Sequence, residues 1–175
     1  FFEHYVAIAD AMNFLGGTGL WDEADGFYYD QLLLHGRPIP LRTRSLVGLI
    51  PLIAVEVLES EILEGLPGFK KRMDWFLANR RDLTRTISYL DLRKDDVEPH
   101  THRLLAIPSR ERLERVLKYM LDESEFLSPH GIRSLSRYHQ DHPYVFPIDG
   151  QEHRVEYVPG ESSTLHFGGN SNWRG

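Results

Sequence analysis

Apolar side chains recur at helical spacing in three stretches of the chain. Over residues 2–12 they lie three or four positions apart, which places them on one face of a helix. Pro67 suits the first turn of a second helix over 67–80, and Ser109 is a good N-cap for a third over 109–125. The apolar stripe of the third helix consists of Leu113, Val116, Leu117, Met120 and Leu121. We therefore expect a helix in each stretch.

The longest apolar run, residues 46–58, predicts a fourth helix that is buried on nearly all sides. The run has about 13 residues and contains Glu56, whereas a membrane span needs about 20 apolar residues. We place this helix over 45–58. Its regular part should begin near Leu49 or Ile50, because Pro51 fits only the first turn of a helix.

Turn signals separate short candidate strands elsewhere in the chain. Asp25-Gly26 and Asp149-Gly150 are strong hairpin signals, and a further return is expected at residues 35–38. Residues 82–107 lack clean periodicity and predict a short helical turn followed by a partly extended connection. The pattern as a whole predicts a mainly α chain of about four helices with β-hairpin and loop excursions.

Composition narrows the classes of partner. A chain of 175 residues suits one domain, and its net charge of −6 is spread without a basic stripe. We therefore expect no nucleic acid partner and no membrane partner. Cysteine is absent, which excludes disulfides and thiolate metal sites and fits a reducing compartment, so we expect a cytoplasmic protein. We expect neither a metal nor a cofactor.

The aromatic and acidic stretch at residues 21–30 is a candidate sugar subsite. Trp21 and Asp22 place an aromatic face beside a carboxylate, the combination that carbohydrate sites use. Burial of the tryptophan in a hairpin explains the same residues. Asp22, Asp25 and Asp30 resemble a calcium loop, although their spacing misses the EF-hand pattern.

Two further stretches carry candidate chemistry. Arg42 and Arg44 could bind a carboxylate or a sugar hydroxyl, or pair with acids of the protein. Arg133 precedes a histidine-rich stretch in which His139, Asp141 and His142 could be imagined as zinc ligands. The chain ends in a loop that contains Trp173 and Arg174, and a flexible loop without a ligand is the plain alternative.

Several of these stretches together resemble the catalytic domain of glycoside hydrolase family 63, the processing α-glucosidases and their bacterial relatives. The resemblance runs from Gly19 to Gly175 and is carried by GLWDEADGFYYDQLLL, LRTRSLVGLIPLIAVEVL, SPHGIRSLS and NSNWRG. In that family the Trp-Arg-Gly stretch continues into a proline and another helix, which implies that residues 1–175 are one segment of a domain truncated at both ends.

The resemblance implies a partial (α/α)6 toroid and an inverting hydrolysis by two carboxyl groups about 6.5–9.5 Å apart. Both catalytic carboxylates would lie outside this segment, so the segment alone is expected to be inactive. The implied partners are a carbohydrate substrate and the remainder of the barrel. The positions that would contact sugar are Trp21, Asp22, Arg133, Trp173 and Arg174. A non-catalytic glycan-binding or structural helical module is the alternative.

Overall fold

The computed structural model describes residues 1–14, 19–84, 88–90 and 102–158. The chain divides into two compact units, the first made of residues 1–21 and 51–113 and the second of residues 22–50 and 114–175. In the described ranges, no helix is both long and apolar enough to cross a membrane.

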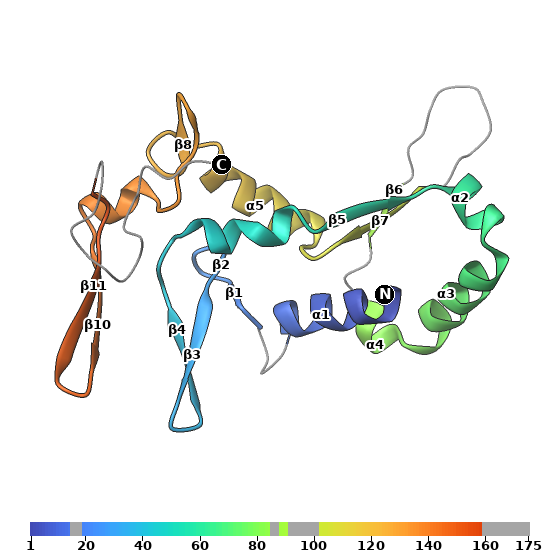
Figure 1. Ribbon diagram of the computed structural model, residues 1–175, viewed down its shortest axis with the longest axis horizontal. Coiled ribbons are helices and arrows are strands. Elements are labelled where there is room, and N and C mark those ends of the chain that lie inside the picture. The colour runs from blue at the N-terminus through green and yellow to red at the C-terminus, as the bar shows by residue number, and fades with distance from the viewer. Residues whose placement is uncertain (15–18, 85–87, 91–101, 159–175) are drawn as a thin grey trace. The chain divides into compact units, whose positions relative to one another are not determined.

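Helices and strands alternate along the chain (Figure 1). The α-helices are α1 (Phe2–Phe14), α2 (Ser60–Gly65), α3 (Pro67–Asn79), α4 (Arg81–Thr84) and α5 (Arg110–Met120), and the 3-10 helices are η1 (Leu46–Leu52) and η2 (Arg137–Gln140). The strands are β1 (Trp21–Asp22), β2 (Phe27–Tyr28), β3 (Asp30–Leu34), β4 (Arg37–Leu41), β5 (Val55–Leu58), β6 (Ser88–Leu90), β7 (His102–Ala106), β8 (Leu127–Ser128), β9 (Gly131–Ile132), β10 (Tyr144–Ile148) and β11 (Gln151–Val155).

The fold is mixed α and β, so the predicted mainly α class and its partial (α/α)6 toroid are wrong. Helices hold 42% and strands 29% of the described residues. The strands form the pairs β1–β2, β3–β4, β8–β9 and β10–β11 and the three-stranded sheet β5-β7-β6. The pairs β3–β4, β8–β9 and β10–β11 and the three-stranded sheet are antiparallel. Strands therefore occur in segments that were predicted to be helical or to be connections between helices.

The region predicted as one buried helix, 45–58, shows why the class was wrong. It forms the 3-10 helix η1 and then the strand β5. Pro51 lies inside η1 and has no N–H to continue an α-helical ladder. Beyond it, Val55 and Val57 alternate with Glu56, a period of two that suits a strand, and their β-branched side chains favour that conformation.

Other predicted elements are confirmed. α1, α3 and α5 lie where the apolar spacing placed helices, and the Arg112 N–H donates to Ser109 Oγ at 3.3 Å as the predicted cap requires. Two-residue turns join β3 to β4 and β10 to β11. The extended end of the 82–107 connection is β7.

The core of the first unit lies between α1 and α3, with α4 also against α1 (Figure 1). The Phe2 ring meets the edges of the Phe69 and Phe76 rings, with centroids 6.0 and 5.8 Å away. Farther along α1, the Tyr5 hydroxyl donates to the Ala54 carbonyl at 2.7 Å, and burial raises the pKa of Tyr5 to about 12. These contacts fix α1 against α3 and against the segment that contains Ala54.

The core of the second unit is built around Phe27. Its ring is fully buried. The ring centroid lies 5.3 to 5.9 Å from the ring centroids of Tyr29, Tyr119 and Phe126. Gly48 packs directly on this ring, since a Cβ at that position would lie 2.3 Å from a Phe27 ring carbon. A glycine is therefore required where η1 crosses the aromatic cluster.

The second unit also carries two hairpins, β3–β4 and β10–β11, that are drawn as slender two-stranded ribbons in Figure 1. The turn residues of β3–β4, His35 and Gly36, have φ of 49° and 76°, the left-handed values of a tight hairpin turn. Leu34 pairs with Arg37, so Pro38 and Pro40 fall where a backbone N–H would point away from β3. A proline there removes the donor that an approaching strand needs.

Prolines on β4 should therefore protect the hairpin from edge-to-edge association. Replacing both, Pro38→Thr with Pro40→Thr, restores two outward N–H groups and should increase light scattering as the full-length protein is concentrated. The control is Pro67→Ala, the same loss of proline at the start of α3. Scattering by the double variant no greater than that of wild type and control would contradict this role.

Candidate functional site

An ion pair between Asp22 and Arg42 forms the centre of the candidate site. Arg42 Nη2 lies 2.8 Å from Asp22 Oδ2, with the arginine side chain 52% exposed and the aspartate side chain 14% exposed. The other carboxylate oxygen, Oδ1, accepts the Asp25 N–H at 2.9 Å. One oxygen is thus committed to the turn that follows β1, and the other faces a solvent-exposed guanidinium.

The turn over residues 22–26 has a well-defined hydrogen-bonded frame. The Gly26 N–H donates to the Asp22 carbonyl at 2.8 Å, and Gly26 has φ of 71°. A Cβ on Gly26 would lie 2.4 Å from Nε of Arg115, so both the backbone angle and the packing require glycine. This agrees with the hairpin signal at Asp25-Gly26.

The turn is attached to a half-buried charged cluster around Arg44. The Tyr29 hydroxyl donates to Asp25 Oδ2 at 2.9 Å and also hydrogen bonds with Arg44. Arg44 Nη1 pairs with Glu125 Oε1 at 2.6 Å, with both side chains less than 15% exposed. Burial raises the pKa of Tyr29 well above its ordinary value, so the phenol remains protonated and keeps its donor.

Three other side chains complete the Arg44 cluster. The guanidinium lies over the rings of Tyr119 and Tyr138, 4.8 and 4.2 Å from their centroids. The Ser136 hydroxyl donates to the second oxygen of Glu125. A buried ion pair is tolerated when its remaining donors and acceptors find partners, and these contacts provide them.

His139 fastens the backbone beside Arg44. The imidazole is 2% exposed; its Nε2 accepts the Arg44 N–H at 2.9 Å, and its Nδ1 lies 2.9 Å from the His142 carbonyl. These partners require a neutral ring with the proton on Nδ1. Burial lowers the pKa of His139, which agrees with this neutral form.

The structure places the sequence-predicted site residues in different environments. Trp21 is 3% exposed, and the Arg112 guanidinium lies 4.9 Å from its ring centroid. Arg133 is 8% exposed and donates to the carbonyls of Glu123, Glu125 and Leu127. Of the predicted positions that are described, Asp22 pairs its carboxylate with an exposed guanidinium.

Trp173 and Arg174, the other two predicted sugar contacts, lie outside the described residues. All five positions remain predictions as substrate contacts. For Trp21 and Arg133, the observed surroundings are packed side chains and backbone carbonyls, the arrangement of residues that hold a fold together.

Metal binding finds no support among the described side chains, where no group of three or more histidine, aspartate or glutamate residues could hold an ion. Both ring nitrogens of His139 are engaged with backbone groups, so this imidazole has no lone pair left for zinc. Asp22 and Asp25 point their carboxylates to an arginine and a tyrosine instead of a shared cation.

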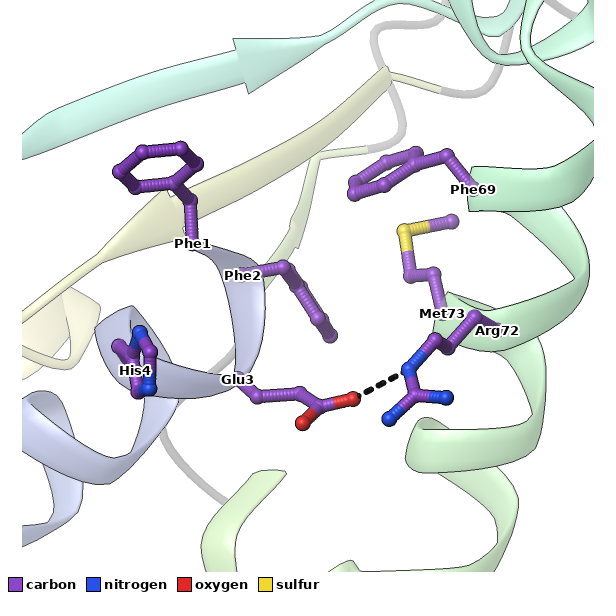
Figure 2. A pocket seen from close by; sticks show the side chains of 7 residues that line it. All are labelled: Phe1, Phe2, Glu3, His4, Phe69, Arg72 and Met73. Carbon is purple, nitrogen blue, oxygen red and sulfur yellow. Dashed lines mark hydrogen bonds and ion pairs between the residues drawn. The ribbon is translucent and has the colours of Figure 1, made fainter.

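A separate cavity of about 220 Å3 lies between α1 and α3 in the first unit. Figure 2 shows Glu3 and Arg72 pointing toward each other across it, with their ion pair at 2.6 Å. The other lining residues are Phe1, Phe2, His4, Phe69 and Met73. Since its acid and its guanidinium satisfy each other, this largely apolar cavity offers few groups that could orient a polar substrate.

The residues of α5 that reach the turn were not among those predicted from the sequence. Arg115 donates to the Glu23 carboxylate and to the Glu23 carbonyl, both at 2.6 Å, and the Tyr119 hydroxyl donates to the Asp25 carbonyl. The available signal was the i, i+4 spacing of Arg115 and Tyr119, which places them on one face beside the apolar stripe. Their target could not be read from spacing.

Comparison with known proteins finds a relative in yeast. The uncharacterized protein YMR196W of Saccharomyces cerevisiae is 46% identical over 189 residues, an alignment that covers all of this chain and 17% of the yeast protein. No family model matches the chain, and no solved structure matches it. The chain thus spans about a sixth of the length of the relative it matches.

The neutral His139 predicts a loss of stability in acid. Its pKa is lower in the folded protein than the ordinary 6.5 of the unfolded chain, so its contribution is present above pH 6.5 and declines as the pH falls below that value. The free energy of unfolding should fall by up to about 1.4 kcal/mol per pH unit in this range. Denaturant unfolding of wild type and His139→Gln between pH 7.5 and 5 measures the effect.

Glutamine keeps an acceptor for the Arg44 N–H but does not titrate, so the variant should lose less stability in acid than wild type. His142→Gln is the matched control, because His142 is an exposed imidazole on the same segment. An equal pH dependence of the unfolding free energy in wild type and His139→Gln would contradict the conclusion that His139 is neutral in the folded protein.

Proposed function

We propose that this chain supplies part of the saccharide-binding surface of an α-glucosidase-like glycoside hydrolase. The observation that supports this best is the ion pair of Asp22 and Arg42, whose acceptor and donor atoms lie 2.8 Å apart and whose arginine side chain is 52% exposed. The resemblance of its surrounding sequence to glycoside hydrolase family 63 gives the enzyme class.

The chemistry of the pair suits neighbouring sugar hydroxyls. Each hydroxyl is both a donor and an acceptor, and an ionised carboxylate has about four acceptor positions, of which the turn and Arg42 occupy two. Arg42 retains further N–H donors on its exposed side. Hydrogen bonds to charged groups are stronger than those between neutral groups, so such a pair can fix the orientation of a sugar ring.

The mixed fold contributes nothing to the choice of enzyme class, which depends on the motifs and on the turn. The reaction proposed is hydrolysis with inversion, in which one carboxylic acid protonates the leaving oxygen and a carboxylate activates water on the opposite face. Both of these groups are proposed to lie outside residues 1–175. An α-glucoside would then release the β-anomer first, which proton NMR of the fresh product detects.

Loss of the Asp22 charge should weaken substrate use by the full-length protein. Asp22→Asn keeps the shape of the side chain but gives up charge-assisted bonds, so kcat/KM for an aryl α-glucoside should fall roughly 10- to 100-fold. Glu156→Gln is the control, because Glu156 also pairs with an exposed arginine, Arg154, at 2.8 Å. The control should retain wild-type kinetics.

The assay also separates the enzyme from a glycan-binding module. A change in tryptophan fluorescence on addition of saccharide, without release of product, would indicate a non-catalytic binding protein and not a hydrolase. Product release that is equally fast in Asp22→Asn and wild type would remove Asp22 from the binding surface. Neither binding nor turnover over a panel of α-glucosides would overturn the proposed function.

A further inference from the structure

We infer that Arg115 and Tyr119 are positioning residues that set the direction of the Asp22 carboxylate. This inference rests on the proposed function of Asp22. It starts from the Asp25 N–H, which holds Asp22 Oδ1 at 2.9 Å and leaves Oδ2 directed at Arg42. The orientation of the carboxylate is therefore set by the position of one peptide group in the turn.

Helix α5 binds that turn at two carbonyl groups. Arg115 donates to the Glu23 carbonyl at 2.6 Å, and the Tyr119 hydroxyl donates to the Asp25 carbonyl. Residues four apart on a helix lie one above the other on the same face. The spacing of Arg115 and Tyr119 along α5 thus matches two carbonyls that are two residues apart in the turn.

Tyr29 holds the same turn through a side chain. Its hydroxyl donates to Asp25 Oδ2 at 2.9 Å, so Asp25 is fixed by its carbonyl, its carboxylate and its N–H at once. Because residue 25 is held at three points, its N–H has little freedom to move, and a carboxylate bound to that N–H keeps one direction. Asp22 therefore gains its orientation from residues that need not touch the sugar.

Tyr119 allows a clean test because its ring has separate contacts. The ring packs at 75° against Phe27, with centroids 5.4 Å apart, and lies beneath the Arg44 guanidinium. Tyr119→Phe keeps this packing and removes the hydroxyl bond to Asp25. Tyr138→Phe is the matched control, since Tyr138 also contacts the Arg44 guanidinium but belongs to η2.

The experiment is a double-variant cycle in the full-length protein, with the affinity for a non-hydrolysable α-glucoside analogue measured by titration. Tyr119→Phe should weaken binding about five-fold, the effect of one lost hydrogen bond, while Tyr138→Phe leaves it unchanged. In the Asp22→Ala background, Tyr119→Phe should have no further effect, because its action passes through the Asp22 carboxylate. Additive effects of the two changes would overturn the inference.

A crystal structure of Tyr119→Phe separates this inference from the proposed function. Movement of Asp22 Oδ2 away from Arg42 would support positioning by α5 even where wild type binds no saccharide. An Asp22 carboxylate that stays in place would overturn positioning even where wild type binds and hydrolyses the sugar.

Discussion

The ion pair of Arg44 and Glu125 is the interaction on which the second unit depends most. It joins the segment after β4 to the turn after α5, and both side chains are largely withdrawn from water. Removal of one partner from such a pair leaves an uncompensated charge, which typically costs 3–5 kcal/mol. The protein surrounds the pair with hydroxyl groups and aromatic rings, so that few of its polar atoms lack a partner.

Two tyrosines at the border of this cluster connect it to the candidate site. Tyr29 and Tyr119 contact Arg44 on one side and Asp25 on the other. Asp25 in turn holds Asp22. A buried charge thus anchors the tyrosines, the tyrosines fix the turn, and the turn directs a single carboxylate at the exposed Arg42 guanidinium. The packed side of this chain of contacts stabilises the unit, and the end at Arg42 is the proposed ligand-binding position.

Much of the local structure could be predicted from sequence, because local rules determine it. The spacing of apolar residues predicted α1, α3 and α5, and the turn residues predicted the hairpins whose turns contain His35 and Asp149. The fold class could not be predicted, since an apolar run such as 46–58 is compatible both with a buried helix and with a 3-10 helix followed by a strand. Pairing of β5 with β7 crosses more than forty residues, and no local pattern specifies it.

The site was predictable to a smaller extent. The aromatic and acidic composition of residues 21–30 singled out Asp22, but the same composition suggested Trp21, which is buried. The partners that decide the geometry, Arg42, Arg115 and Tyr119, come from distant parts of the chain. Whether an arginine faces solvent or carbonyl groups, as Arg133 does, is a tertiary property that sequence spacing leaves open.

The most direct measurement is a crystal structure of the full-length protein soaked with a non-hydrolysable α-glucoside analogue. We predict a sugar whose neighbouring hydroxyls lie within hydrogen-bonding distance of Asp22 Oδ2 and the Arg42 guanidinium, with the hydrogen bond from the Asp25 N–H to Asp22 intact. A bound sugar whose hydroxyls contact neither side chain would contradict this prediction.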